Sequence, residues 1–398
     1  MEIRKLTEND RDACRKLMRY AFQTLKNSYE NLEFPQDSLP MDWYYGAFVE
    51  EELYACIGVT PFDIKLRSQD FKMGGVMGVA TKPEYRNRGI VRDLMVRWFK
   101  EMYKNNIPIS VLYPFKFSFY EMLGYRLVDE SVLYHFKISD IKYKETNYVM
   151  NEVERINEDF QKVYDKAILN FDYIAKRPMI ENWRRLFKEN YKFICYRGNQ
   201  PVGYLIISFI QRSLDRYDWF KHPERTILIR EAFWLDNIAK QTIFNFLWSH
   251  RDQRRYIAGF FPPNENIIDL LKTPRIKERF IIGNSMLRVI NVKTVLDNLK
   301  YPKATFSILF QIHDDFCPWN NGYFNLNSNE TKIEVEYNES SSEKVDLEID
   351  ISYFSQLIAG FRTVRDLLEF GFISVNEEKL KLLEVLFPKT NNFFFDFF

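Results

Sequence analysis

Two stretches of the chain carry the same order of predicted elements, and this duplication constrains the fold more than any other feature of the sequence. Similar strand candidates occur in both, LYACIGVTPF in the first and VGYLIISFI in the second. In each stretch a further apolar strand precedes a helix, and a third strand, ISVLYPFK or YIAGFFPP, precedes a short helix. One supersecondary order that recurs at similar spacing indicates a duplicated domain.

The chain is long enough for a further domain. At roughly 100–200 residues per domain, 398 residues correspond to two to four domains. From about residue 291 the strand candidates ILFQIHD, KIEVEYN and VDLEIDI are followed by helix candidates at 353–368 and 377–386. Strands followed by helices are typical of an α+β domain. The sequence therefore predicts a mixed α/β, or α+β, fold with three domains, at residues 1–144, 145–290 and 291–398.

The charge and hydropathy of the chain argue against several classes of protein. The 56 basic and 55 acidic side chains give a net charge of +1, whereas nucleic-acid binding rests on an excess of Lys and Arg. No apolar stretch approaches the ~20 residues of a membrane span, and the charged amino terminus is unlike a secretory signal. The cysteines form no CxxC pair, which favours reduced thiols, a cytoplasmic protein and no metal site. The four cysteines are Cys14, Cys56, Cys195 and Cys317.

A short basic loop, KPEYRNRGI, follows an apolar strand candidate and opens a helix. It places Arg86, Arg88 and Arg92 at the amino end of that helix, where the helix dipole disfavours each cation by about 0.3–1 kcal/mol. A bound anion would offset this cost, because free backbone N–H groups, a close-approach Gly89 and guanidinium groups together suit a phosphate. The alternative is that the arginines are solvated on an exposed turn. The glycine patterns of P-loop and dinucleotide-binding proteins are both absent.

The helix after the basic loop is strongly amphipathic, which favours a built site over a plain surface turn. Its apolar face is formed by Ile90, Val91, Leu94, Met95, Trp98, Phe99 and Met102. In the second copy the corresponding stretch reads LDNIAK, with no glycine and with Asp236 at the expected cap position. We therefore expect anion binding in the first copy and none in the second.

The stretch MGVATKPEYRNRGIVRDLM resembles the acetyl-CoA motif of the GNAT N-acetyltransferases. In that motif a splayed strand is followed by a Q/R-x-x-G-x-G/A loop that cradles the pyrophosphate. Arg86 and Gly89 match the pattern, and Val91 stands where it prefers Gly or Ala. A longer resemblance, through VATKPEYRNRGI, LYPFKFSFYEMLGY and the terminal FFFDFF, is to the Eis-type (enhanced intracellular survival) branch.

The resemblance covers essentially the whole chain and carries expectations for each part. It implies two tandem GNAT acyltransferase domains, the second degenerate, and a C-terminal sterol-carrier-like α+β domain. It also implies acetyl-CoA as co-substrate, without a metal. The residues it assigns to acetyl-CoA binding are Val79, Ala80, Thr81, Arg86, Asn87, Arg88, Gly89, Ile90, Val91, Arg92, Phe115 and Lys116.

Acyl transfer from a thioester to an amine needs a group that protonates the departing thiolate. The resemblance assigns this role to Tyr120, which stands in a YxxxGY context with Gly124 and Tyr125. A phenol has a pKa near ~10 and a thiol near ~8.5, so a tyrosine can protonate a thiolate at modest cost. The alternative is that Tyr120 is a core aromatic.

The general base is harder to assign from the residues. None of the scattered histidines is near the basic loop or Tyr120 in sequence; they are His135, His222, His250 and His313. The resemblance implies that the terminal α-carboxylate, here on Phe398, is the base. The last six residues hold five of the 36 phenylalanines, and burial of each would contribute about 1.5–3 kcal/mol to docking of the chain end in a cleft of the first domain. The alternative is that these phenylalanines complete the core of the third domain. Asp396 is a rival carboxylate in the same tail.

These features favour an acetyl-CoA-dependent N-acetyltransferase that acts on primary amines. By resemblance the acceptors are aminoglycoside-like polyamines or lysine side chains, and the protein is a homo-hexamer. Two alternatives stay open. The third segment resembles a sterol carrier, which could hold a lipid, and a GNAT domain without its base could bind CoA without turnover.

Overall fold

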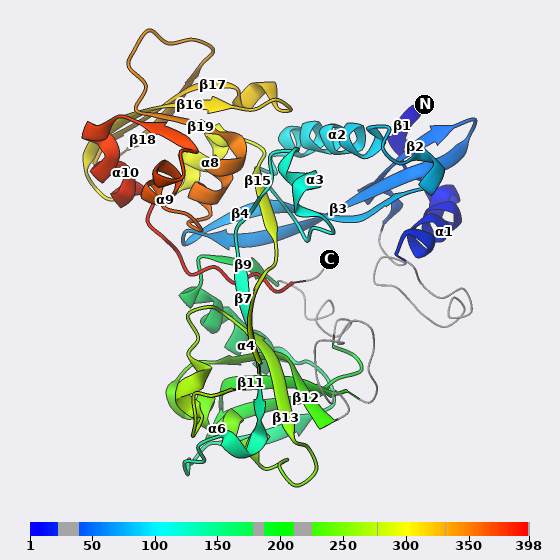
Figure 1. The fold of residues 1–398 in the computed structure, drawn as a ribbon, viewed down its shortest axis with the longest axis vertical. Helices are drawn as coiled ribbons and strands as arrows, with labels where there is room; N and C mark the ends of the chain where they lie inside the picture. Colours follow the sequence, from blue (N-terminus) through cyan, green and yellow to red (C-terminus); the bar gives the residue numbers. More distant parts are fainter. Residues whose placement is uncertain (23–39, 178–186, 211–224, 277, 331, 397–398) are drawn as a thin grey trace. The chain divides into compact units, whose positions relative to one another are not determined.

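The structure, a computed structural model, describes residues 1–22, 40–177, 187–210, 225–276, 278–330 and 332–396. The chain forms two compact units (Figure 1). Unit 1 consists of residues 1–129, 173–175 and 284–398, and unit 2 of residues 130–172 and 176–283. The two units are described separately below.

The first sheet of unit 1 has eight strands in the described part of the chain, in the order β1-β2-β3-β4-β5-β15-β6, with β9 paired to β3. The strands are β1 (Glu2–Lys5), β2 (Tyr44–Val49), β3 (Glu52–Leu66), β4 (Gln69–Thr81), β5 (Ile109–Leu112), β6 (Arg126–Leu127), β9 (Tyr173–Lys176) and β15 (Met286–Val289). Long β3 and β4 form an antiparallel hairpin, whereas β4 and β5 are parallel. The strand β15, far along the chain, completes the sheet beside β5.

Among the described residues, three α-helices belong to this part of unit 1: α1 (Arg11–Ala21), α2 (Ile90–Lys104) and α3 (Phe117–Glu121). The predicted apolar face of α2 is confirmed, since six of its seven residues are buried and Val91 is half-buried. Neighbouring strand residues enter different cores, Tyr44 with α1 and Tyr45 with α2. Because successive side chains of a strand point to opposite faces, α1 and α2 cover opposite faces of the sheet.

The last hundred residues form a second, five-stranded sheet of unit 1, in the order β18-β17-β16-β19-β20. The strands are β16 (Thr305–His313), β17 (Gly322–Asn329), β18 (Ile333–Asn338), β19 (Leu347–Asp350) and β20 (Ile373–Val375). The helices are α7 (Val292–Asn298), α8 (Ile351–Ile358), α9 (Val364–Glu369) and α10 (Leu380–Leu386). Large side chains such as Phe310 and Phe354 fill the core, which is continuous with Ile64 and Phe71 of the β3–β4 hairpin.

Unit 2 contains a seven-stranded sheet in the order β14-β7-β13-β12-β11-β10-β8. The strands are β7 (Glu130–Lys137), β8 (Val149–Val153), β10 (Tyr191–Arg197), β11 (Gln200–Phe209), β12 (Thr226–Trp234), β13 (Tyr256–Phe261) and β14 (Glu278–Gly283). Helices α4 (Glu158–Ala167) and α6 (Asn237–Trp248) pack on it. The pair β12–β13 is parallel, with α6 between the strands in sequence, as β4–α2–β5 is in unit 1. The predicted duplication is therefore present in the structure.

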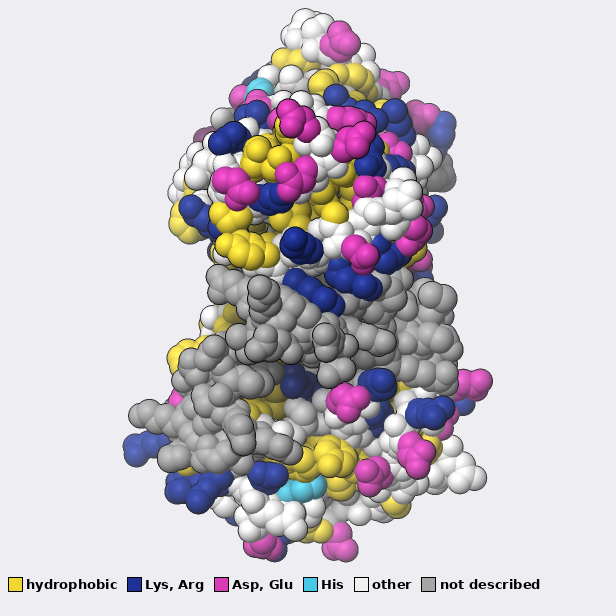
Figure 2. Space-filling view, turned by 90° about the vertical axis from the view of Figure 1, so that its right-hand side faces the viewer, with side chains coloured by type: hydrophobic (Ala, Val, Ile, Leu, Met, Phe, Trp, Pro, Cys, Tyr) yellow, Lys and Arg dark blue, Asp and Glu magenta, His cyan; other side chains and the backbone are white. Residues whose placement is uncertain are grey.

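The described surface has no dominant charge on the face shown in Figure 2, where basic and acidic side chains are interspersed. This agrees with the net charge of +1. Within the described residues, no helix combines the length and apolar character that a membrane span requires.

Candidate active site

The strands β4 and β5 pair only over part of their length. Their parallel pairing ends at Val76 and Leu112, while β4 continues to Thr81. Opposite this extension the register of β3 and β4 shifts between Cys56 and Gly58, and Gly78 has a left-handed φ of 58°. The far end of β4 is therefore released from β5, which leaves its backbone groups on that side available to a ligand.

The basic loop lies directly after this released end of β4. A short 3₁₀ turn at Pro83–Tyr85 leads to Arg86, and α2 begins after Gly89. Asn87 and Gly89 both have left-handed φ values, 61° and 77°. A Cβ on Gly89 would come within 3.1 Å of the Arg92 guanidinium, so glycine suits both the conformation and the space.

The amino end of α2 has the features of an anion site. No side chain caps it at Gly89, so its first backbone N–H groups remain free to bind a ligand. Arg86 and Arg88 are exposed, and among the described residues neither has a carboxylate partner. Arg86 instead donates from Nε to the carbonyl of Thr81 at 3.3 Å. Two uncompensated cations at the positive end of a helix fit a polyanionic ligand.

The residues expected to bind the co-substrate fall into three groups by exposure. Val79, Thr81, Val91 and Gly89 are half-buried, whereas Arg92, Asn87, Phe115 and Lys116 are exposed. The side chains of Ala80 and Ile90 are buried in the core. Only the backbone groups of these last two could contact a ligand, so their side chains serve packing.

The corresponding helix end in unit 2 is closed by the protein itself. The Asp236 carboxylate accepts a hydrogen bond from the Ala239 backbone N–H at 2.8 Å and one from the Tyr148 hydroxyl at 3.4 Å. The predicted cap is confirmed. A carboxylate takes the place that a phosphate would need at α6.

Tyr120 lies in α3, a short helix that follows β5. Only 2% of its surface is exposed, and its ring makes edge contacts with Phe119 (5.0 Å between centroids) and Phe115 (5.5 Å). Among the described residues its hydroxyl has no hydrogen-bond partner. Burial raises the pKa of Tyr120 well above its usual range. The phenol is therefore protonated at neutral pH but is a weaker acid than an exposed tyrosine.

Unlike that of Tyr120, the hydroxyl of neighbouring Tyr125 has a hydrogen-bond partner among the described residues. Its hydroxyl is bonded to the Ser110 Oγ at 2.7 Å, and the Ser110 hydroxyl contacts the Gly74 carbonyl. Burial raises the pKa of Tyr125 as well. Of the two tyrosines in the YxxxGY string, Tyr125 therefore belongs to the core and Tyr120 has the available hydroxyl.

The histidines lie in other settings. His135 Nδ1 is paired with Glu278 at 2.7 Å in unit 2, and His313 is paired with Glu348 at 3.0 Å in the C-terminal domain. His250 contacts the Phe246 carbonyl at 3.0 Å. His222 lies outside the described residues.

The C-terminal tail is attached to unit 1 from its first residues. Arg67, at the turn of the β3–β4 hairpin, donates to the carbonyls of Leu357 (2.8 Å) and Ile358 (2.6 Å) at the end of α8 and to that of Pro388 (2.9 Å). Further on, the Asn392 amide donates to the carbonyls of Val128 and Ala359, both at 2.8 Å. The tail therefore runs along both sheets of unit 1.

The structure describes three of the five phenylalanines of the tail, Phe393, Phe394 and Phe395. Phe393 and Phe394 are 6% and 0% exposed, and Phe394 belongs to the same core as Phe310 and Phe354 of the C-terminal domain. Their role as an anchor of the chain end stays a prediction. Asp396, the rival carboxylate, is 3% exposed. Phe398, the candidate base, lies outside the described residues, as does Phe397. The last described residues contact Tyr113 and Asp129, which the sequence did not single out.

Three family models match the chain. Residues 2–128 and residues 175–289 each match an acetyltransferase (GNAT) domain. Residues 292–395 match a sterol carrier protein domain. A GNAT fold implies an acyl-CoA co-substrate and an amine acceptor.

One curated sequence relative and two solved structures are similar to most or all of the chain. An uncharacterized N-acetyltransferase of Streptomyces coelicolor is 21% identical over 354 residues, which are 82% of each chain. The crystal structure of a probable N-acyltransferase from Enterococcus faecalis superimposes with a TM-score of 0.86 at 21% identity, covering 100% of this chain and 99% of that one. Eis1 of Mycobacterium abscessus superimposes with a TM-score of 0.78 at 18% identity and full coverage of both chains. The chain is therefore an acetyltransferase with two GNAT domains followed by a sterol carrier protein domain, and it shares the fold of Eis1.

Proposed function

We propose that the chain transfers the acetyl group of acetyl-CoA to primary amines and that the reaction takes place in its first domain, residues 1–144. The observation that carries this proposal is the uncapped amino end of α2 beside exposed Arg86 and Arg88. These groups suit the pyrophosphate of CoA, and the released end of β4 can hydrogen-bond the amide-rich arm that leads to the thioester. The thioester would then lie toward α3 and Tyr120.

Each group has a defined task in the transfer. The neutral amine attacks the thioester carbonyl, the new C–N bond forms and the C–S bond breaks. Tyr120 gives its phenolic proton to the departing thiolate, since a phenol is protonated at neutral pH. Burial raises the pKa of Tyr120 and so adds to the cost of this transfer. The proton lost by the amine is taken up by a carboxylate, for which we propose the α-carboxylate of Phe398.

The pKa values of the terminal carboxylate and of the amine must move closer together, or a water must relay the proton, before the carboxylate can act as the base. A terminal carboxylate has a pKa of ~3.3–3.7 and an alkyl ammonium one of ~10.4, so direct transfer would be uphill by about 7 pKa units, or ~9 kcal/mol. Burial among aromatic rings raises the pKa of a carboxylate, desolvation lowers that of an amine, and a water can relay the proton. Phe393 and Phe394, five and four residues before the carboxylate, are buried, and we propose that the chain end shares such an apolar setting. Asp396, also buried, remains the rival base.

The acceptor class is tested by thiol release. Purified protein is incubated with acetyl-CoA and a panel of amines that includes an aminoglycoside, a linear polyamine and a lysine-containing peptide, and free thiol is followed. We expect release that depends on at least one amine. Hydroxyl analogues of the same compounds serve as controls, because they lack the nucleophile. Absence of release with every amine would overturn the proposed reaction.

The basic loop gives a separate prediction about co-substrate binding. Arg86→Ala is expected to weaken CoA binding by about 10-fold or more, because a charge-assisted hydrogen bond contributes about 1.5–3 kcal/mol. Arg97→Ala is the matched control, since Arg97 is an exposed arginine of α2, the helix that follows the loop, and contacts the Tyr45 ring. Calorimetric titration with CoA measures both variants. Equal affinities for Arg86→Ala and wild type would place the pyrophosphate elsewhere.

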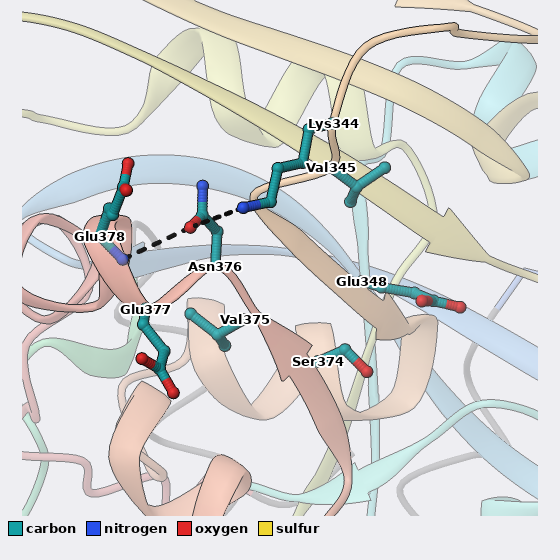
Figure 3. Close-up of a pocket in the computed structure, with 8 residues that line it drawn as sticks. All are labelled: Lys344, Val345, Glu348, Ser374, Val375, Asn376, Glu377 and Glu378. Atoms are coloured by element: carbon teal, nitrogen blue, oxygen red, sulfur yellow. Dashed lines mark hydrogen bonds between the residues drawn. The ribbon is translucent and has the colours of Figure 1, made fainter.

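Lipid binding is the weaker candidate function. The pocket drawn in Figure 3 has a volume of about 420 Å³ and lies at β19–β20 of the C-terminal domain. Charged side chains such as Lys344, Glu348 and Glu377 line it, whereas a lipid cavity is lined by apolar groups. We assign residues 291–398 to placement of the tail. The homo-hexamer expected from the resemblance stays a prediction.

A further inference from the structure

Both backbone polar groups of Phe394 are bound by side chains of unit 1, Tyr113 directly after β5 and Asp129 two residues after β6. The Phe394 N–H donates to the Asp129 carboxylate at 3.3 Å. The Phe394 carbonyl accepts a hydrogen bond from the Tyr113 hydroxyl at 3.1 Å. Phe394 lies outside any helix or strand, so these contacts replace the ladder that would otherwise fix its backbone.

The Asp129 carboxylate is itself held by neighbouring donors. It is fully buried and accepts from the Ser285 backbone N–H at 2.9 Å, from the Ser285 hydroxyl and from the Asn284 amide at 3.3 Å. A buried carboxylate is costly unless it is hydrogen-bonded, and burial raises the pKa of Asp129 to about 6. Residues 284–285 therefore fix the carboxylate, and the tail supplies its remaining donor.

A tyrosine connects these donors to the ring of Phe394. The Tyr173 hydroxyl is bonded to the Ser285 Oγ at 2.9 Å, and the Tyr173 carbonyl accepts the Phe393 N–H at 3.0 Å. The Phe394 ring lies 5.2 Å from the Tyr173 ring and 6.2 Å from the Tyr113 ring, between centroids. The peptide and the ring of Phe394 are thus held by one connected set of side chains, those of Asp129, Ser285, Tyr173 and Tyr113.

Tyr113 links this set to the reacting region. It follows β5 directly and precedes α3, the helix of Tyr120. Phe398 is four residues beyond Phe394, a span of at most ~14 Å in an extended chain. A small displacement of the Phe394 peptide would therefore displace the chain end.

We propose that Asp129 and Tyr113 are positioning residues that clamp the Phe394 peptide and hold the Phe398 carboxylate where it can accept the proton of the amine. This inference rests on the proposed function, because it takes the terminal carboxylate as the base. Neither residue touches the acetyl group. They act through the tail.

The test combines turnover with a direct measure of the tail. Asp129→Asn replaces a carboxylate oxygen by an NH₂ group, which cannot accept the hydrogen bonds that Ser285, Asn284 and Phe394 donate at this position. Tyr113→Phe removes the hydroxyl that donates to the Phe394 carbonyl and keeps the ring. Hydrogen exchange of the peptide covering residues 390–396 is followed by mass spectrometry in both variants, with the melting temperature and with kcat and KM for acetyl-CoA. Asp346→Asn is the matched control: Asp346 is 8% exposed and accepts from the Leu309 N–H and the Asn376 amide, both at 3.0 Å, away from the tail.

We expect Asp129→Asn to speed exchange in the tail and to lower kcat by about 100-fold, the effect of a misplacement near 1 Å, with KM for acetyl-CoA within about twofold. Tyr113→Phe should lower kcat by about 10-fold, which corresponds to one hydrogen bond. Asp346→Asn should lower the melting temperature alone. A merely structural role would lower kcat in step with the folded fraction.

Two results would contradict different parts of the mechanism. Unchanged exchange of the tail in both variants would overturn the clamp. Faster exchange with unchanged kcat would leave the clamp in place and overturn the terminal carboxylate as the base.

Discussion

Deletion of Phe398 is expected to lower kcat by about 100-fold or more and to leave KM for acetyl-CoA nearly unchanged. The reason is that a positioned general base contributes about 10²–10⁴-fold, and the deletion moves the terminal carboxylate back by one residue, about 3.5 Å. Co-substrate binding should be unaffected, because we propose that it depends on the loop at Arg86 and Gly89. Steady-state kinetics with a saturating amine measure the effect.

Two further variants separate the carboxylate from the ring that carries it. Phe398→Ala keeps the terminal carboxylate in place and should cost much less than the deletion. Asp396→Asn removes only the rival carboxylate. If the deletion variant keeps full turnover while Asp396→Asn loses it, the base is Asp396 and the assignment to Phe398 is wrong.

Tyr120→Phe is expected to lower kcat by about 10²–10⁴-fold, because it removes the proton donor and keeps the shape of the ring. The variant should fold normally, since among the described residues the Tyr120 hydroxyl has no hydrogen-bond partner to lose. Turnover is measured with acetyl-CoA and the best amine of the panel, and the melting temperature is measured in parallel.

Tyr125→Phe is the matched control for this prediction. It removes a hydroxyl that is bonded to Ser110, so it should lower the free energy of unfolding by about 1 kcal/mol and change kcat little. Tyr120→Phe with wild-type turnover would rule out Tyr120 as the general acid.

Local features of the sequence predicted much of this fold. The helical period from Ile90 to Met102 placed α2, and LDNIAK placed Asp236 at the cap of α6. Both follow from interactions between residues within one helix turn or one helix face, which a local pattern records. The concentration of phenylalanine in the last six residues likewise predicted an anchor, and Phe393 and Phe394 are buried.

Long-range pairing could not be predicted in this way. The strand β15 joins β5 and β6 across more than 150 residues, and nothing in the stretch MLRV specifies that partner. Asp129 is a similar case, since its donors at 284–285 and 394 are distant in sequence. A lone aspartate after a strand reads as a turn residue. Only the fold brings Asp129, Asn284, Ser285 and Phe394 together.

Transfer of labelled acetyl from acetyl-CoA to an amine is the most direct measurement of the proposed reaction. Wild-type protein is expected to bind CoA and to move the label onto at least one primary amine, with release of one free thiol for each amide formed. A protein that binds CoA through the Arg86 loop and transfers no label to any amine would instead be a CoA-binding scaffold, and the assignment of Tyr120 and Phe398 as acid and base would fall with the activity.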